Sequence, residues 1–242
     1  MNKNYFINSS LFGLFQFLIC ILVSSGCASG STVTDIDGNE YPTIKIGDQW
    51  WTAENLKVTH YNNGEPIPHV TDGEEWSNLI TGAYSAYGND PDNIPVYGLL
   101  YNWYAADDSR GICPQGWHTS SDEDWMELEL LLGIEEIDLD RIAWRGEGLG
   151  EKLKDTESGL WTSNISDQTN ETGFSIVPSG GRTSDPAYGG DFFYQGIHSA
   201  IWTSDEMDDR IALFRAFWNN NSGIKRNYYN KGNGFSIRCV KD

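Results

Sequence analysis

The stretch CPQGWHTSSDEDWMELELLLG, residues 113–133, decides most of what the sequence indicates about the fold. Ser121 is a good helix N-cap, and Asp124 three positions later completes a capping-box pattern. An apolar stripe follows at helical spacing, formed by Trp125, Leu128 and Leu132. Gly133 is a typical stop signal. The sequence therefore predicts a helix over residues 120–133, in which the carboxylates of the first turn cap the helix rather than serve catalysis.

Short strands are predicted on both sides of this helix. Between Gly38 and Gly47 the side chains alternate with a period of two, which indicates a hairpin or meander over residues 33–56. Residues 57–98 are rich in turn signals and are expected to form long loops, and residues 135–144 are expected to form a second helix. Further strands are predicted over residues 173–182, 200–204, 212–218 and 234–240, the last three as a terminal β-meander.

The composition excludes two broad classes of protein. The chain has 242 residues with 35 acidic and 16 basic side chains, so its formal net charge is −19. A protein that binds a nucleic acid backbone needs clustered Lys and Arg, so we expect no nucleic acid partner. Aromatic residues make up 13% of the chain, which is too much apolar surface for a disordered tail. Since no repeat or composition break divides the chain, one domain is predicted.

The first residues are typical of an export signal. A mostly apolar run over residues 11–23 is followed by small residues and then by Cys27. A Cys directly after a Gly resembles a lipoprotein signal, which implies that residues 1–26 are a signal peptide and that Cys27 carries lipid. Ordinary secretion and a retained membrane anchor remain as alternatives. We expect residues 27–32 to form a tether and residues 33–242 to form the domain. A lipid anchor is expected to hold the protein to the outer membrane of the cell envelope, on either its periplasmic or its surface face.

The cysteine count predicts one disulfide. Cys20 lies in the expected signal peptide and Cys27 is assigned to the lipid, which leaves Cys113 and Cys239. Two cysteines in an exported chain favour a disulfide, although two buried free thiols remain the alternative. Ile237 and Cys239 share one face of the last predicted strand, so Cys239 is expected to point into the core.

Four strings in this sequence resemble the Fibrobacter succinogenes major paralogous domain. They are DIDGNEYPTIKIGDQWWTAENL (35–56), YGLLYNWYAA (97–106), CPQGWHTSSDEDW (113–125) and GFSIRCVKD (234–242). The resemblance covers essentially all of residues 33–242. It implies a C-type-lectin-like fold, also similar to that of formylglycine-generating enzymes, of the α+β class, with small twisted antiparallel sheets, one or two helices and long ordered loops. It also implies an exported protein or lipoprotein of Bacteroidetes or related bacteria, and it implies no particular biochemical role.

No catalytic pattern stands out, so we expect the protein not to be an enzyme. The four histidines are widely spaced and match no HExxH-type pattern: His60, His69, His118 and His198. For His118 we expect a structural hydrogen-bonding role. The alternative is an oxidoreductase similar to the formylglycine-generating enzymes, in which only Cys113 and Cys239 could be the reactive residues.

An acidic cluster is formed by Asp205, Glu206, Asp208 and Asp209. Carboxylate oxygens suit calcium, but the spacing fits no EF-hand loop. We therefore expect a solvated loop and no cofactor, and a calcium site remains the alternative.

The segment WNNNSGIKRNYYNKGNG, residues 218–234, combines amide, aromatic and basic side chains. Rings supply rigid contact area and amides supply adaptable hydrogen bonds, a combination typical of binding loops. The predicted ligand-binding residues are Trp202, Arg215, Trp218, Asn219, Asn220, Arg226, Tyr228 and Tyr229. We expect non-catalytic binding of a glycan or protein ligand at the cell surface. The alternative function is that of a structural or adhesin-type surface protein without a small-molecule site. For the segment itself, the alternatives are a plain Asn-rich hairpin and a variable region.

Overall fold

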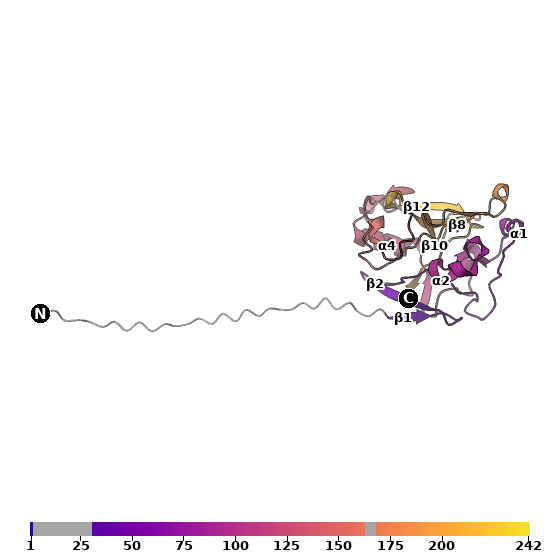
Figure 1. The fold of residues 1–242 in the computed structure, drawn as a ribbon, viewed down its shortest axis with the longest axis horizontal. Coiled ribbons are helices and arrows are strands. Elements are labelled where there is room, and N and C mark those ends of the chain that lie inside the picture. Colours follow the sequence, from indigo (N-terminus) through magenta and orange to yellow (C-terminus); the bar gives the residue numbers. More distant parts are fainter. Residues whose placement is uncertain (2–30, 163–167) are drawn as a thin grey trace.

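The computed structural model describes Met1, residues 31–162 and residues 168–242 (Figure 1). The predicted signal peptide and Cys27 lie outside the described residues. The described part of the chain folds into small antiparallel sheets joined by long loops and short helices. This confirms the predicted α+β class.

A five-stranded sheet contains both ends of the described domain. Its order is β1 (Thr32–Thr34), β2 (Glu40–Ile46), β3 (Gln49–Thr52), β13 (Cys239–Lys241) and β6 (Trp117–Thr119). All pairs are antiparallel. The meander predicted over residues 33–56 is confirmed as β1 to β3. Strand β13 lies between β3 and β6 and pairs with both. The C-terminal strand therefore belongs to this sheet and not to a C-terminal meander.

A four-stranded antiparallel sheet is built from the C-terminal half. Its order is β10 (His198–Glu206), β11 (Ile211–Trp218), β12 (Asn221–Asn230) and β7 (Ala143–Arg145). The strands predicted over 200–204 and 212–218 are confirmed. The predicted terminal meander is wrong, because β12 rather than residues 234–240 pairs with β11. Most of residues 218–234, which were expected to form a binding loop, therefore belong to strand β12. The many Asn residues of this segment make its period-two alternation hard to recognise in the sequence.

Two further strand pairs are short: β4 (Tyr84–Ser85) with β5 (Leu100–Tyr101), and β8 (Gly181–Arg182) with β9 (Phe192–Phe193). Of the strand predicted over residues 173–182, only β8 forms.

One α-helix is longer than five residues among those described. It is α4 (Asp122–Leu132), with Ser121 as N-cap, a capping box to Asp124 and Gly133 in the left-handed region at its end, as predicted. Three short α-helices are α1 (Gly73–Ser77), α2 (Ile94–Tyr97) and α3 (Trp103–Ala106). Five 3₁₀ turns are η1 (Tyr87–Asn89), η2 (Pro91–Asn93), η3 (Glu136–Asp138), η4 (Gly150–Lys152) and η5 (Pro186–Tyr188). The second helix predicted over residues 135–144 is wrong, because this segment pairs through β7 with β12.

Helix α4 packs between the two larger sheets, and Figure 1 shows it between β12 and β2. The ring of Trp125 lies 5.1 Å from that of Trp51 in β3 and 6.3 Å from that of Phe217 in β11. A disulfide joins Cys113 to Cys239, which confirms the predicted pair. It ties the loop before β6 to β13 in the five-stranded sheet. No helix of the described chain is long and apolar enough to cross a membrane.

Candidate ligand-binding site

The four-stranded sheet has two faces of different composition. Arg215 lies opposite Ile201 and Arg226, whereas Ala216 lies opposite Ala200 and Lys225. Because successive side chains of a strand point to opposite faces, each register row belongs to one face only. We call the face that carries Arg215 the helix side, since it packs on α4. We call the face that carries Lys225 the hollow side.

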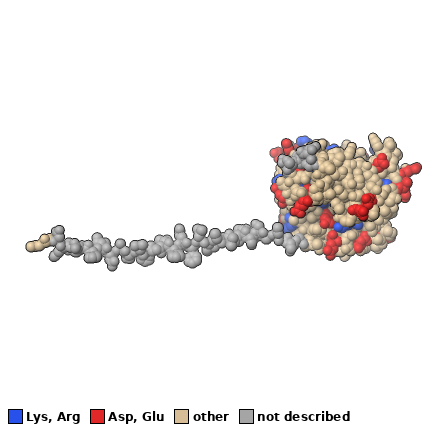
Figure 2. Space-filling model, in the orientation of Figure 1, with Lys and Arg blue, Asp and Glu red and all other residues tan. Residues whose placement is uncertain are grey.

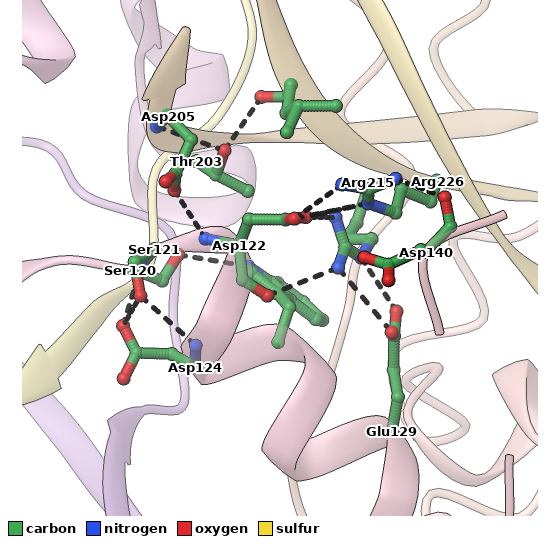
Figure 3. Close-up of polar contacts among 12 residues, drawn as sticks. Ser120, Ser121, Asp122, Asp124, Glu129, Asp140, Thr203, Asp205, Arg215 and Arg226 are labelled. Carbon is green, nitrogen blue, oxygen red and sulfur yellow. Dashed lines mark hydrogen bonds and ion pairs between the residues drawn. The ribbon is translucent and has the colours of Figure 1, made fainter. Parts of the chain in front are cut away.

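The helix side contains a buried network of charges (Figure 3). Arg215 donates from Nη1 to Asp122 at 2.7 Å and from Nε to Glu129 at 2.7 Å. Arg226 donates from Nη2 to the same Asp122 at 2.6 Å, and Arg145 of β7 pairs with Glu129. Both carboxylates come from α4. The network therefore links the helix to three strands.

Burial by itself would raise the pKa of Asp122, but hydrogen bonds from Arg226 and the charge of Arg215 outweigh it and lower this pKa. The carboxylate thus stays ionised in the interior, where it satisfies both guanidinium groups. The structure corrects the prediction for Arg215 and Arg226, since their side chains are buried in this network and hold the sheet to the helix.

Trp202 is also corrected. It lies on the hollow side, but its exposed fraction is 0% and its Nε1 donates to the carbonyl oxygen of Tyr101 at 3.0 Å. Its ring lies 4.6 Å from that of Phe235, within the core. Trp202 is therefore a core residue beneath the sheet surface, and its side chain does not contact a ligand.

Above this core layer, the hollow side forms a concave surface lined by rings, which we call the aromatic hollow. Its inner part has a volume of about 170 Å³, and the walls include Phe193, Tyr194, His198, Phe214, Trp218 and Tyr229. An outer part of about 420 Å³ shares Phe193, Tyr194 and Tyr229 with the inner part. Lys225 and Asn227 of β12 complete the inner wall. Two of the predicted ligand-binding residues, Trp218 and Tyr229, therefore meet at one site.

The rings of this wall contact one another. The Trp218 ring lies 4.8 Å from that of His198 and 5.1 Å from that of Tyr194, and the Phe214 ring lies 6.4 Å from that of Tyr229. Tyr194 has φ 60°, a left-handed backbone that bulky residues rarely adopt. Its carbonyl oxygen accepts hydrogen bonds from the N–H groups of Ile197 and His198. Backbone strain of this kind is often found at functional sites, and here it places a ring over the hollow.

The charges at the hollow are few. His198 is buried, and burial first and the nearby Lys225 second lower its pKa to about 3. It is therefore a neutral imidazole at physiological pH. Its Nδ1 is buried and has no hydrogen-bond partner among the described residues.

The remaining predicted residues lie elsewhere. Asn219 donates from Nδ2 to the carbonyl oxygen of Thr162 and fixes the turn between β11 and β12. Asn220 lines a separate hollow of about 600 Å³ with Trp144 of β7. Tyr228 is 41% exposed but points away from the aromatic hollow, because it alternates with Tyr229. The structure thus does not bring these three residues to the same site.

Several lining residues were missed by sequence reasoning. Lys225 and Asn227 share the period-two spacing of Tyr229, so recognising residues 221–230 as a strand would have grouped them. Phe193, Tyr194 and His198 reach the site through a turn and the start of β10, and no local pattern indicates that contact.

The acidic cluster has structural partners. The Asp205 carboxylate accepts from the backbone N–H of Asp122, and Glu206 pairs with Lys231. Asp208 accepts from the N–H groups of Arg210 and Ile211. Figure 2 shows acidic side chains spread over the visible face in separate groups. Within the described residues, no group of three or more His, Cys, Asp or Glu side chains is arranged to hold a metal ion.

His118 has the structural role that was expected. Its ring nitrogens contact Asp242 at 2.7 Å and Asp124 at 3.1 Å. The hydrogen bond with Asp124, first, and that with Asp242 outweigh partial burial and raise the pKa of His118 to about 9. The residue therefore ties the C-terminus to the N-cap of α4.

A search of curated proteins and of solved structures found no match to this chain. A family model does match, and it covers residues 44–241. This range includes α4, both disulfide cysteines and most of the two larger sheets. The resemblance noted in the sequence is thereby confirmed, and the chain belongs to the Fibrobacter succinogenes major domain family.

Proposed function

We propose that this protein is a lipid-anchored envelope protein whose domain binds carbohydrate at the cell surface without catalysing a reaction. The observation that carries the proposal is the aromatic hollow, where Trp218, Tyr229 and Tyr194 line a concave surface on the open side of a sheet. The rings of Tyr194 and Tyr229 are each 51% exposed, so a ligand in the hollow can contact them.

The chemistry of such a surface suits sugars. A pyranose ring has apolar C–H faces that stack on aromatic rings, and its hydroxyl groups exchange hydrogen bonds with amides such as that of Asn227. The inner part, about 170 Å³, is smaller than the roughly 300–1,000 Å³ of common ligand pockets. A ligand would therefore occupy the inner and outer parts together, as two or more linked sugar rings can.

We propose in addition that the fold is of the C-type-lectin-like kind. Small antiparallel sheets, short helices and long loops around one disulfide support this assignment. A solved structure of the domain, compared with C-type lectins, tests it, and a different order of strands in the central sheets would reject it.

The lipid anchor rests on the sequence around Cys27, which lies outside the described residues. Metabolic labelling with an alkyne-bearing fatty acid tests it. The wild-type chain should take up the label and appear in the outer membrane fraction, whereas Cys27→Ser should do neither. Labelling that persists in Cys27→Ser would reject the anchor.

A glycan array probed with the detergent-solubilised full chain tests the binding function. We expect binding to a restricted set of glycans and loss of that binding in Trp218→Ala. Phe174→Leu, a change in the core away from the hollow, controls for loss of stability. An array on which no glycan binds, or on which Trp218→Ala binds as well as the wild type, would reject the proposal and favour the structural or adhesin-type alternative.

A further inference from the structure

Lys225 is the one Lys or Arg among the described residues that line the aromatic hollow. Most other described lysines pair with a carboxylate, namely Lys45, Lys57, Lys152, Lys154 and Lys231. Lys225 has no carboxylate at ion-pair distance among the residues that the structure describes, although acidic side chains outnumber basic ones 35 to 16 in this chain. In so acidic a protein, an ammonium group without such a partner leaves charge available for a ligand.

The position of this ammonium group is set by the sheet. Lys225 lies between Ala216 of β11 and Trp144 of β7 in one register row, so its neighbours on the hollow side are a methyl group and a ring. Its Nζ lies 5.8 Å from the centroid of the Trp144 ring, a cation–π contact. This contact orients the side chain but uses none of its N–H donors. Since no described residue accepts a hydrogen bond from Nζ, its three N–H groups can be offered to an anionic group.

The walls of the inner hollow favour an anion at this end. None of the residues that line the inner part is acidic, whereas Asp191 lines the outer part. A carboxylate ligand group would thus meet Lys225 at the inner end and avoid Asp191 at the outer end. The inner end of the hollow therefore suits an anionic group of the ligand, and the outer end suits an uncharged one.

His198 adds a neutral polar group beside the lysine. It is 5% exposed, and its Nδ1 lacks a partner within the described residues. A neutral imidazole can donate one hydrogen bond and accept another. A buried polar atom without a partner costs stability, so a ligand hydroxyl group that reaches this ring would recover it.

We infer that the aromatic hollow binds an acidic sugar, such as a uronic acid residue of a glycan, whose carboxylate meets the ammonium group of Lys225 and whose hydroxyl group bonds to His198. This inference rests on the proposed carbohydrate binding and names its ligand class. The sugar ring stacks on Trp218, and the next, uncharged ring of the glycan occupies the outer part of the hollow.

Matched pairs of glycans test this inference. Each pair consists of an oligosaccharide with a uronic or sialic acid and the same oligosaccharide with its carboxyl group reduced to an alcohol, and both are applied to the full chain in detergent. We expect at least one pair in which the acidic form binds about tenfold more tightly. Lys225→Met should abolish this difference, because the acidic form loses its cationic partner and the reduced form never had one. Lys241→Met, which removes the same charge from an exposed site in β13, should keep the difference.

The outcomes separate this inference from the proposed function. Glycans that bind equally well in both forms, or a preference that persists in Lys225→Met, overturn the acidic-sugar inference and leave carbohydrate binding intact. Binding of no glycan overturns both. His198→Phe should weaken both forms by a similar factor, because it removes a hydrogen bond and no charge; an unchanged affinity overturns the role of His198.

Discussion

Lys225 and Arg226 are neighbours in β12, yet they belong to opposite faces of the same sheet. On the helix side, Arg226 shares Asp122 with Arg215 in a network closed off from solvent. On the hollow side, Lys225 lies beside aromatic rings with no carboxylate at ion-pair distance in the described chain. One face satisfies its charges internally, and the other leaves charge and rings open to solvent.

The two faces of the sheet are expected to contribute to different properties, the helix side to stability and the hollow side to ligand binding. Buried charges tolerate little change, because losing one partner leaves the other charge uncompensated in the interior. Rings at an open surface, and an ammonium group without a carboxylate partner in the described part of the chain, tolerate substitution, because solvent replaces what is removed. Substitutions on the helix side should therefore alter the free energy of unfolding, and those on the hollow side should alter affinity.

The largest effect is expected for Glu129→Ala. This change leaves both Arg145 and Arg215 without their shared carboxylate, so we expect the free energy of unfolding to fall by about 3–5 kcal/mol. Urea unfolding followed by tryptophan fluorescence measures it. A loss below about 1 kcal/mol would mean that the network does not hold α4 to the sheet, and the comparison of the two faces would fail.

The adjacent pair in β12 allows a sharper comparison. Arg226→Met should lower the free energy of unfolding by about 2–3 kcal/mol, because Asp122 loses charged hydrogen bonds. Lys225→Met should change it by less than about 0.5 kcal/mol. The same urea titration serves both variants. Equal losses would contradict the assignment of these side chains to different faces.

Tyr228 and Tyr229 provide the matching test for binding. Tyr229→Ala removes a ring from the hollow and should weaken glycan affinity about tenfold. Tyr228→Ala removes a ring of similar exposure, 41% against 51%, from the other face and should leave affinity unchanged. Titration calorimetry with a glycan selected on the array measures both. Equal weakening by the two substitutions would show that binding does not depend on the hollow.

The smallest effect concerns pH and the exposed contacts of His118, which join β6 to the first turn of α4 and to Asp242. The pKa of His118 is raised to about 9 in the folded protein, above the value near 6.5 of an unfolded chain. Its contacts with Asp124 and Asp242 therefore stabilise the fold fully below about pH 6.5, and this stability is lost as the pH rises towards 9. Unfolding measured at pH 6 and 9 should show the loss, and His118→Gln should reduce it. A wild-type stability that does not decrease over this range would contradict the assignment.

Local patterns were sufficient for several elements. Ser121, Asp124 and Gly133 bounded α4, because capping depends on groups within one helical turn. The first meander followed from its turns and its period of two, and the cysteine count led to the disulfide. In residues 234–240 the same alternation was misleading. Arg238 is buried like Cys239, since this segment is covered on both sides.

The sequence by itself determined that residues 218–234 would carry rings, amides and cations close together, and that α4 would carry carboxylates. Only the tertiary structure decided which of them meet. Alternation along a strand is local, but the packing of α4, together with the segment that carries Asp140, determines that the face with Arg215 and Arg226 is closed. The loop that bears Tyr194 determines that the face with Trp218 becomes a hollow. Both contacts join segments far apart in the chain, and the spacing of residues along one strand contains no information about them.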